Sequence, residues 1–174
     1  ASPYDEHTAS TDYGAPFASV NRNKRSVVLD FKKEDDKEVF LQLCDKADAL
    51  VENMRAGVMD RLGLGYEVVS KRNPGIVYAC VRGFGDPRTG ESPYAEWPCL
   101  DAAAQSFGGL VYANDNLVTP ALADIFSGTL MGLGVVSAIH NAKKTGKGQF
   151  LDVSMYDAMM AFQKSAVAQY GFTG

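Results

Sequence analysis

Short apolar segments alternate with amphipathic ones over residues 26–81, and this alternation constrains the fold more than any other feature of the sequence. Residues 26–31 and 49–53 are brief and strand-like, whereas residues 32–48 repeat apolar side chains at three- and four-residue steps. A strand, a helix and a second strand in this order predict a βαβ unit with a right-handed crossover. The sequence therefore predicts an α/β fold, with a parallel, Rossmann-like sheet and flanking helices.

The rest of the chain continues this pattern. Polar residues punctuated by glycine and proline predict a loop or arm at residues 1–20, and a second such loop at residues 86–97. Between and after these loops the apolar periodicity predicts a helix that ends near residues 61–63, and further helices or strands over residues 66–71, 76–81, 98–110, 124–143, 150–153 and 154–170. No internal repeat and no interdomain linker interrupts the series.

Asp124 opens the longest apolar run and is the only charged residue between Asp115 and Lys143. An aspartate just before a helix-period segment is typical of an N-cap, because its carboxylate accepts backbone N–H bonds and faces the positive end of the helix dipole. The same position suits an ionised nucleophile, because the helix end stabilises the charge and small neighbouring residues leave space for a substrate. Spacing alone favours the N-cap.

Composition and charge exclude several classes of protein. A chain of 174 residues with 46% hydrophobic and 22% charged residues contains enough apolar material for one globular core. A net charge of −4 argues against nucleic acid as the main partner and against an anionic membrane surface. The apolar run at residues 125–139 is shorter than a membrane span and carries serine and threonine. We therefore expect neither a nucleic-acid nor a membrane partner.

The cysteines and histidines do not form a metal-site pattern. Cys44, Cys80 and Cys99 are odd in number and widely spaced, and only two histidines are present, so we predict neither a disulfide framework nor a metal site. A reducing, cytoplasmic location is the default expectation for such a chain. The Gly83–Gly85 segment does not complete a dinucleotide-binding fingerprint, because Arg88 stands where its third glycine is required.

Several segments occur in one characteristic order over residues 21–172, namely 23–30, 51–63, 73–78, 83–85, 101–105, 123–128, 145–149 and 152–158. In this order they resemble the class III CoA-transferases, which include formyl-CoA:oxalate and carnitine CoA-transferases and share a fold with α-methylacyl-CoA racemases. Family members are considerably longer. The resemblance therefore implies an internal fragment, in which residues 21–174 form part of the large domain, and an interlocked homodimer for the complete protein.

The resemblance also implies roles for individual residues. It makes the Asp124 carboxylate a nucleophile that attacks an acyl-CoA thioester and passes coenzyme A to an acceptor carboxylic acid through an aspartyl anhydride and an aspartyl-CoA thioester. Coenzyme A is then a substrate, and no further cofactor is expected. The family pattern puts coenzyme A against Leu29, Lys32, Asn53, Met54, Arg61 and Asp101. Of these, Met54 departs from the family, which commonly has an aromatic residue there.

Two alternatives remain open at this level. A racemase of this fold requires a proton-transferring histidine immediately before the acid that corresponds to Asp101, but Leu100 stands there and His7 and His140 lie in other segments. The transferase is therefore the preferred interpretation. A non-catalytic fragment that binds coenzyme A is the other alternative.

Overall fold

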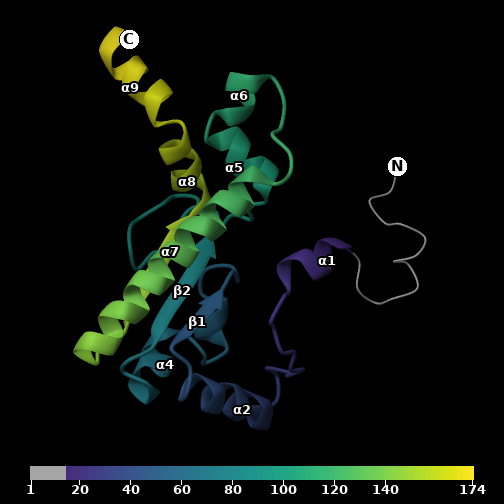
Figure 1. Ribbon diagram of the computed structural model, residues 1–174, viewed down its shortest axis with the longest axis vertical. Helices are drawn as coiled ribbons and strands as arrows, with labels where there is room; N and C mark the ends of the chain where they lie inside the picture. The colour runs from purple at the N-terminus through teal and green to yellow at the C-terminus, as the bar shows by residue number, and fades with distance from the viewer. Residues whose placement is uncertain (1–14) are drawn as a thin grey trace. The chain divides into compact units, whose positions relative to one another are not determined.

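The computed structural model describes residues 15–174, which fall into two units, one that ends at Asp30 and one that spans Phe31–Gly174 (Figure 1). In the described part of the first unit, α1 (Ala15–Val20) is followed by residues 21–30, which contain neither helix nor strand. The loop or arm expected for residues 1–20 is thus wrong for its last six residues, which are helical, and its remainder lies outside the described residues.

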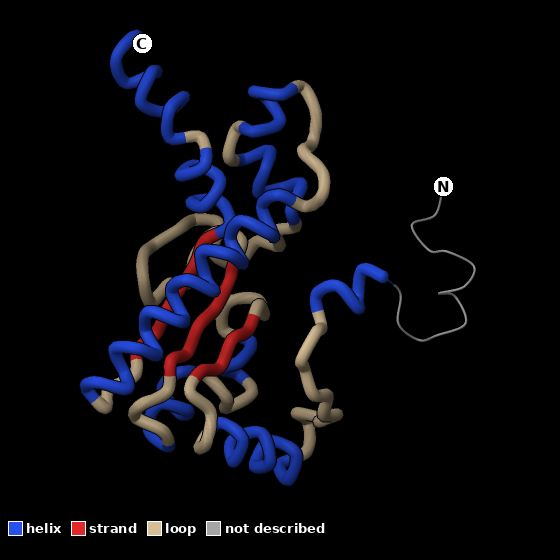
Figure 2. Tube along the Cα trace, viewed as in Figure 1, coloured by secondary structure: helices blue, strands red, loops and turns tan. Residues whose placement is uncertain are grey.

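The second unit is built on a parallel sheet of three strands, shown in red in Figure 2. The strands are β1 (Ala49–Glu52), β2 (Val77–Arg82) and β3 (Gln149–Ser154), with β2 in the centre. Residues 77–80 of β2 are buried, as expected for a central parallel strand that is covered on both faces. The predicted α/β fold is confirmed.

Helices cover both faces of this sheet (Figure 1). On one face, Tyr78 of β2 packs with Cys44 and Val69 from α2 and α4, and on the other face Val77 packs with Ala138 and Ala142 of α7. The helices of the second unit are α2 (Glu34–Cys44), α3 (Val58–Arg61), α4 (Tyr66–Arg72), α5 (Asp101–Phe107), α6 (Leu110–Asn114), α7 (Leu122–Thr145), α8 (Met155–Phe162) and α9 (Lys164–Thr173).

Three of the predicted elements differ from the structure. The strand expected at residues 26–31 is absent, and Val28 is 94% exposed. Apolar, β-branched residues fit a pleated surface but form a strand only where a neighbouring strand is available. The parallel connection therefore runs from β1 through α3 and α4 to β2. The helix expected over residues 98–110 breaks into α5 and α6 at Gly109, whose φ of +77° favours glycine, and the last expected helix breaks at Gln163 into α8 and α9.

Helix α7 is the one helix in residues 15–174 that is long and apolar enough to cross a membrane by length and composition, with a mean hydropathy of 1.7 over an 18-residue window. The expectation that this run is too short for such a span is therefore wrong. Core helices of soluble proteins pass the same test. In this structure α7 lies along β2 and β3, which places its first turn beside the end of the sheet (Figure 1).

Gly148 marks a close approach between the segment after α7 and the segment before β2. Its N–H donates to the carbonyl of Pro74 at 2.7 Å, and a Cβ at this position would lie 1.8 Å from the Ile76 carbonyl oxygen. We expect Gly148→Ala to lower the free energy of unfolding by about 1–3 kcal/mol, because backbone atoms must move. Gly132→Ala on α7 is the control, since no atom lies within 4 Å of its added methyl group. Equal urea-unfolding midpoints for the two variants would contradict the prediction.

Candidate active site

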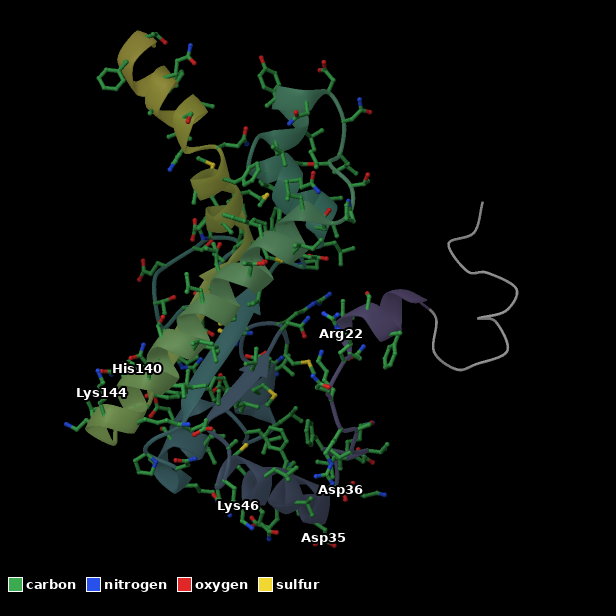
Figure 3. The ribbon with its side chains drawn as sticks, viewed as in Figure 1. Arg22, Asp35, Asp36, Lys46, His140 and Lys144 are labelled. Carbon is green, nitrogen blue, oxygen red and sulfur yellow. The ribbon has the colours of Figure 1, made fainter. Side chains whose placement is uncertain are left out.

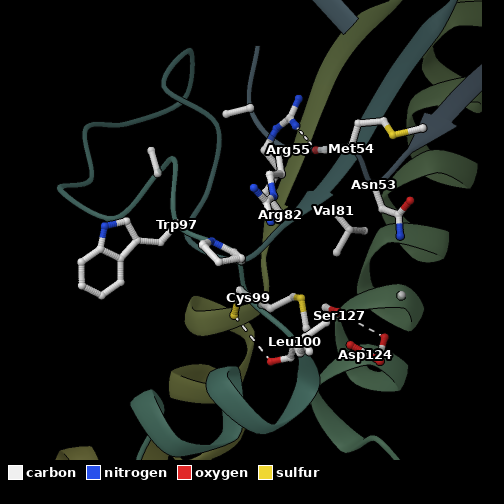
Figure 4. Close-up of a pocket in the computed structure, with 16 residues that line it drawn as sticks. Asn53, Met54, Arg55, Val81, Arg82, Trp97, Cys99, Leu100, Asp124 and Ser127 are labelled. Carbon is white, nitrogen blue, oxygen red and sulfur yellow. Dashed lines mark hydrogen bonds between the residues drawn. The ribbon is translucent and has the colours of Figure 1, made fainter. Parts of the chain in front are cut away.

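A pocket of about 590 Å³ lies at the carboxyl ends of β1 and β2, beside the first turn of α7 (Figure 4). Ligands of parallel α/β sheets usually bind at this end of the strands. The lining comes from residues 53–56 after β1, residues 81–83 at the end of β2, Ala95 and residues 97–100 of the following loop, Asp124, Ser127 and Gly128 of α7, and Met155 of α8. Segments far apart in the sequence therefore converge on the start of α7.

Asp124 is the third residue of α7 and lies in the pocket lining. The N-cap position is occupied by Ala121, so the expectation that Asp124 is the N-cap is wrong. The carboxylate that caps the helix comes from Asp101, whose Oδ1 accepts hydrogen bonds from the backbone N–H groups of Ala123 at 2.7 Å and Asp124 at 3.4 Å. Because Asp101 satisfies these donors, the exposed Asp124 carboxylate makes no hydrogen bond or ion pair with the described residues.

The surroundings of Asp124 disfavour its charged form. Partial burial raises the pKa of the Asp124 carboxyl, and the neighbouring negative charge of Asp101 raises it further. The Cys99 thiol lines the same pocket, and its pKa is raised by burial and then by the charge of Asp124. Cys99 therefore stays protonated at neutral pH.

A buried ion-pair cluster holds the segment that follows β1. Arg82 donates to Glu52 and to Asp86, each at 2.9 Å, and its guanidinium also donates to the carbonyl oxygen of Met54. All three charged side chains are more than nine-tenths buried. Burial raises the pKa of Glu52, and the charge of Arg82 partly opposes this shift. The cluster therefore fixes the backbone of residues 52–54 against the end of β2.

The structure brings together only part of the predicted site. Asn53, Met54 and Asp124 line the pocket, whereas Asp101 lies behind the first turn of α7 and is not in the lining. Arg61 is exposed at the end of α3, and neither it nor Lys32 lines the pocket. Leu29 belongs to the first unit.

The structure also shows the surroundings of Leu100, which stands where a racemase of this fold has its proton-transferring histidine. Leu100 is 78% exposed at the edge of the pocket and carries no group that transfers a proton. His140 lies near the opposite end of α7 (Figure 3), sixteen residues or about 24 Å along the helix from Asp124. His7 lies outside the described residues. The lining of this pocket, within residues 15–174, therefore contains no histidine.

Sequence reasoning missed the Arg82 cluster and Cys99 as parts of this site. The detectable signal for the cluster was an arginine at the end of a buried strand, followed four residues later by Asp86. Within the described range, no group of three or more His, Cys, Asp or Glu side chains is arranged to hold a metal ion. The pocket lining presents the Asp124 carboxylate, the Cys99 thiol, the Asn53 amide and the Arg55 guanidinium.

Comparison with known families gives a match over nearly the whole chain. Residues 2–174 match the family described as CoA-transferase family III. A succinyl-CoA:mesaconate CoA-transferase of Haloarcula hispanica is 40% identical over 168 residues, and an acetyl-CoA:oxalate CoA-transferase of Acetobacter aceti is 41% identical over 170 residues. These alignments cover 93% and 94% of this chain but 42% and 43% of the relatives. The chain thus spans about two-fifths of their length.

A solved structure shows the same fold. The crystal structure of a CaiB/BaiF family protein from Brucella suis matches with a TM-score of 0.79 and 32% sequence identity, over 87% of this chain and 40% of that protein. The similarity includes the parallel sheet and the helices that flank it, because the match covers most of the second unit.

Proposed function

Because the chain belongs to CoA-transferase family III, we propose that the complete protein transfers coenzyme A from an acyl-CoA thioester to a carboxylic acid, with Asp124 as the nucleophile. The observation that carries this proposal is the Asp124 carboxylate, which is exposed in the pocket and leaves helix capping to Asp101. A carboxylate without a hydrogen-bond or ion-pair partner is free to attack an electrophile.

The exchange proceeds in balanced acyl-transfer steps. The Asp124 carboxylate attacks the thioester carbonyl carbon. The C–S bond breaks, coenzyme A departs as a thiolate, and a mixed anhydride remains on Asp124. The thiolate then attacks the aspartyl carbonyl carbon and releases the donor acid, which leaves an aspartyl-CoA thioester. The acceptor carboxylate attacks that carbonyl carbon to form a second anhydride, and the returning thiolate takes the acceptor acyl group and frees Asp124. Covalent catalysis thus divides the exchange between two carboxylic acids into separate acyl-transfer steps.

The pocket residues have distinct roles in this proposal. Asn53 and Met54 line the side that would hold coenzyme A, on a backbone fixed by Arg82. Since Glu52 and Asp86 neutralise Arg82, Arg55 is the remaining arginine of the lining within the described residues and is available to an anionic group of a substrate. The first turn of α7 presents Asp124 in the wall of the pocket.

The proposal extends to residues outside the pocket lining. Leu29, Lys32 and Arg61 are proposed to contact the nucleotide part of coenzyme A in the complete protein, the two basic side chains by pairing with phosphates. Asp101 is proposed to act on α7 rather than to contact coenzyme A, because its carboxylate is occupied by backbone N–H groups of that helix.

The proposed substrate class is based on the names of two relatives. Both pair a short acyl-CoA with a dicarboxylic acid, mesaconate or oxalate. We extend this substrate class to the present protein, with a short dicarboxylic acid as acceptor.

We also expect the complete protein to be a homodimer in the cytoplasm. Exposed Leu133 and Val136 on α7 give such an assembly an apolar surface to cover. Light scattering of the full-length protein should give twice the mass of one chain.

A trapping experiment tests the nucleophile directly. Full-length protein is incubated with succinyl-CoA, quenched with hydroxylamine and digested, and the peptide that contains Asp124 is examined by mass spectrometry. We expect a hydroxamate on Asp124, because hydroxylamine attacks both the anhydride and the aspartyl thioester. Exchange activity with no modification at Asp124 would refute the mechanism. Coenzyme A binding with neither exchange nor modification would favour the non-catalytic alternative. In a separate assay with a 2-methylacyl-CoA, incorporation of solvent deuterium at the α-carbon would favour the racemase.

Asp101→Asn tests the electrostatic coupling between the two carboxylates. The acylation rate requires ionised Asp124, so it falls as pH drops through the pKa of that group. Because the charge of Asp101 raises this pKa, its removal should move the midpoint of the acylation rate to lower pH. The matched control is Asp115→Asn in an exposed turn, which removes the same charge and should leave the midpoint unchanged. A shift to higher pH in Asp101→Asn would contradict the assignment.

A further inference from the structure

Gln105 is a fully buried polar side chain of α5, beside the segment that leads into α7. Its Oε1 accepts a hydrogen bond from the backbone N–H of Val118 at 2.8 Å, while its Nε2 donates to the Val118 carbonyl at 2.9 Å and to Oδ2 of Asp101 at 2.7 Å. Val118 supplies one donor and one acceptor, so only one of the two flipped orientations of the amide satisfies both. The second N–H of the amide is therefore directed at Asp101.

Asp101 transmits this contact to the start of α7. Its other oxygen, Oδ1, accepts the backbone N–H groups of Ala123 and Asp124, which belong to the first helical turn and have no acceptor within the helix. The Asp101 carboxylate is thus held by Gln105 on one oxygen and by the helix that carries Asp124 on the other.

We infer that Gln105 is a positioning residue for Asp124, acting through Asp101 and through the backbone of Val118. This inference rests on the proposed role of Asp124 as the nucleophile. The Gln105 amide holds both ends of residues 118–123, the short connection that enters α7, because it contacts Val118 directly and the Ala123 N–H through Asp101. A nucleophile displaced by about 1 Å from its reacting carbon loses on the order of a hundredfold in rate. Gln105 therefore governs the rate of attack without touching the substrate.

Two substitutions of similar size remove different parts of this contact. Gln105→Met removes all three hydrogen bonds. Gln105→Glu keeps an acceptor for the Val118 N–H, but its ionised carboxylate turns an acceptor oxygen toward the Val118 carbonyl and toward Asp101. Protonation of the introduced carboxyl restores one donor. The activity of Gln105→Glu relative to the parent protein should therefore rise as pH falls, whereas that of Gln105→Met should not.

The experiment follows a single turnover of Asp124 acylation in the full-length protein. Succinyl-CoA starts the reaction, hydroxylamine stops it, and the adduct on Asp124 gives both the rate constant and the fraction of chains that react. In Gln105→Met we expect the rate constant to fall about tenfold or more, while the reacting fraction and the KM for succinyl-CoA stay within about twofold. The control is Gln42→Met, whose amide donates to Glu38 at 3.3 Å on the exposed face of α2, and it should match the parent protein.

The outcomes separate this inference from the proposed function. A smaller reacting fraction with an unchanged rate constant would show a purely structural role for Gln105 and would overturn the inference. A parental rate constant in both Gln105 variants would overturn it as well. If the parent protein exchanges coenzyme A without an adduct on Asp124, the proposed nucleophile is refuted, and the inference about Gln105 is refuted with it. This outcome is measured on the parent protein, before any Gln105 variant is made.

Discussion

Replacing Asp124 by asparagine is expected to slow CoA transfer at least about a thousandfold, because a neutral amide of the same size cannot form the acyl intermediate. The fold should tolerate this change, since the carboxylate makes no hydrogen bond or ion pair with the described residues. The raised pKa of Asp124 shows that the folded state disfavours its charged form, so above this pKa the group contributes less stability than it would with an unshifted pKa. Loss of the charge should therefore leave the urea-unfolding midpoint at pH 7 unchanged or higher.

Asp157→Asn provides a matched control for this variant. Asp157 is the third residue of α8, as Asp124 is of α7, and it is exposed outside the pocket described above. Its replacement removes the same charge from the same position of a helix, so we expect parental exchange rates. An Asp124→Asn variant that retains more than about a tenth of the parental rate would contradict the nucleophile assignment.

The helices and strands that define this fold could largely be predicted from local sequence. The buried apolar run of β2 and the periodic segment of α7 both contain enough residues of one pattern to specify their elements. Residues 26–31 have the same strand-like composition, but no strand forms there, because pairing depends on a partner that the segment itself does not encode.

The candidate site could be predicted only as far as its segments. The apolar run after Asp124 correctly indicated a helix start, but the cap comes from Asp101, which is 23 residues earlier than Asp124 in the chain. Arg82 and Glu52 are separated by 30 residues, so neither predicts its partner from spacing. A side chain in a helix or strand pattern reveals its element, whereas its partner depends on how the elements pack.

Arg82→Met is expected to lower the free energy of unfolding by about 3–5 kcal/mol, because it leaves the buried Glu52 carboxylate without its cation and leaves Asp86 with only the more exposed Arg88, at 3.2 Å. Methionine keeps much of the length and apolar volume of the arginine stem, so the loss reflects charge rather than a cavity. Urea unfolding at pH 7 measures this change.

The pH dependence of Arg82→Met should identify its cause. In the parent protein the charge of Arg82 opposes the rise in the pKa of Glu52, so the variant should have a still higher pKa at that carboxyl. A carboxyl whose folded pKa is raised costs stability above that pKa, and the cost disappears as pH falls through it. The stability difference between the variant and the parent protein should therefore be largest near neutral pH and shrink in acid. A difference that does not change with pH would indicate lost packing instead.

Arg72→Met is the control that separates burial from the number of ion pairs. Arg72 also bridges two carboxylates, Glu38 at 2.7 Å and Asp45 at 2.6 Å, but it does so at the surface. Water and salt screen such pairs, so this substitution should destabilise the protein far less than Arg82→Met. Only Arg82 also donates to the carbonyl of Met54 in the pocket wall. Arg82→Met should therefore weaken coenzyme A binding as well. Calorimetry on the folded full-length variant measures this affinity. An affinity equal to that of the parent protein would show that the cluster does not hold this wall in place.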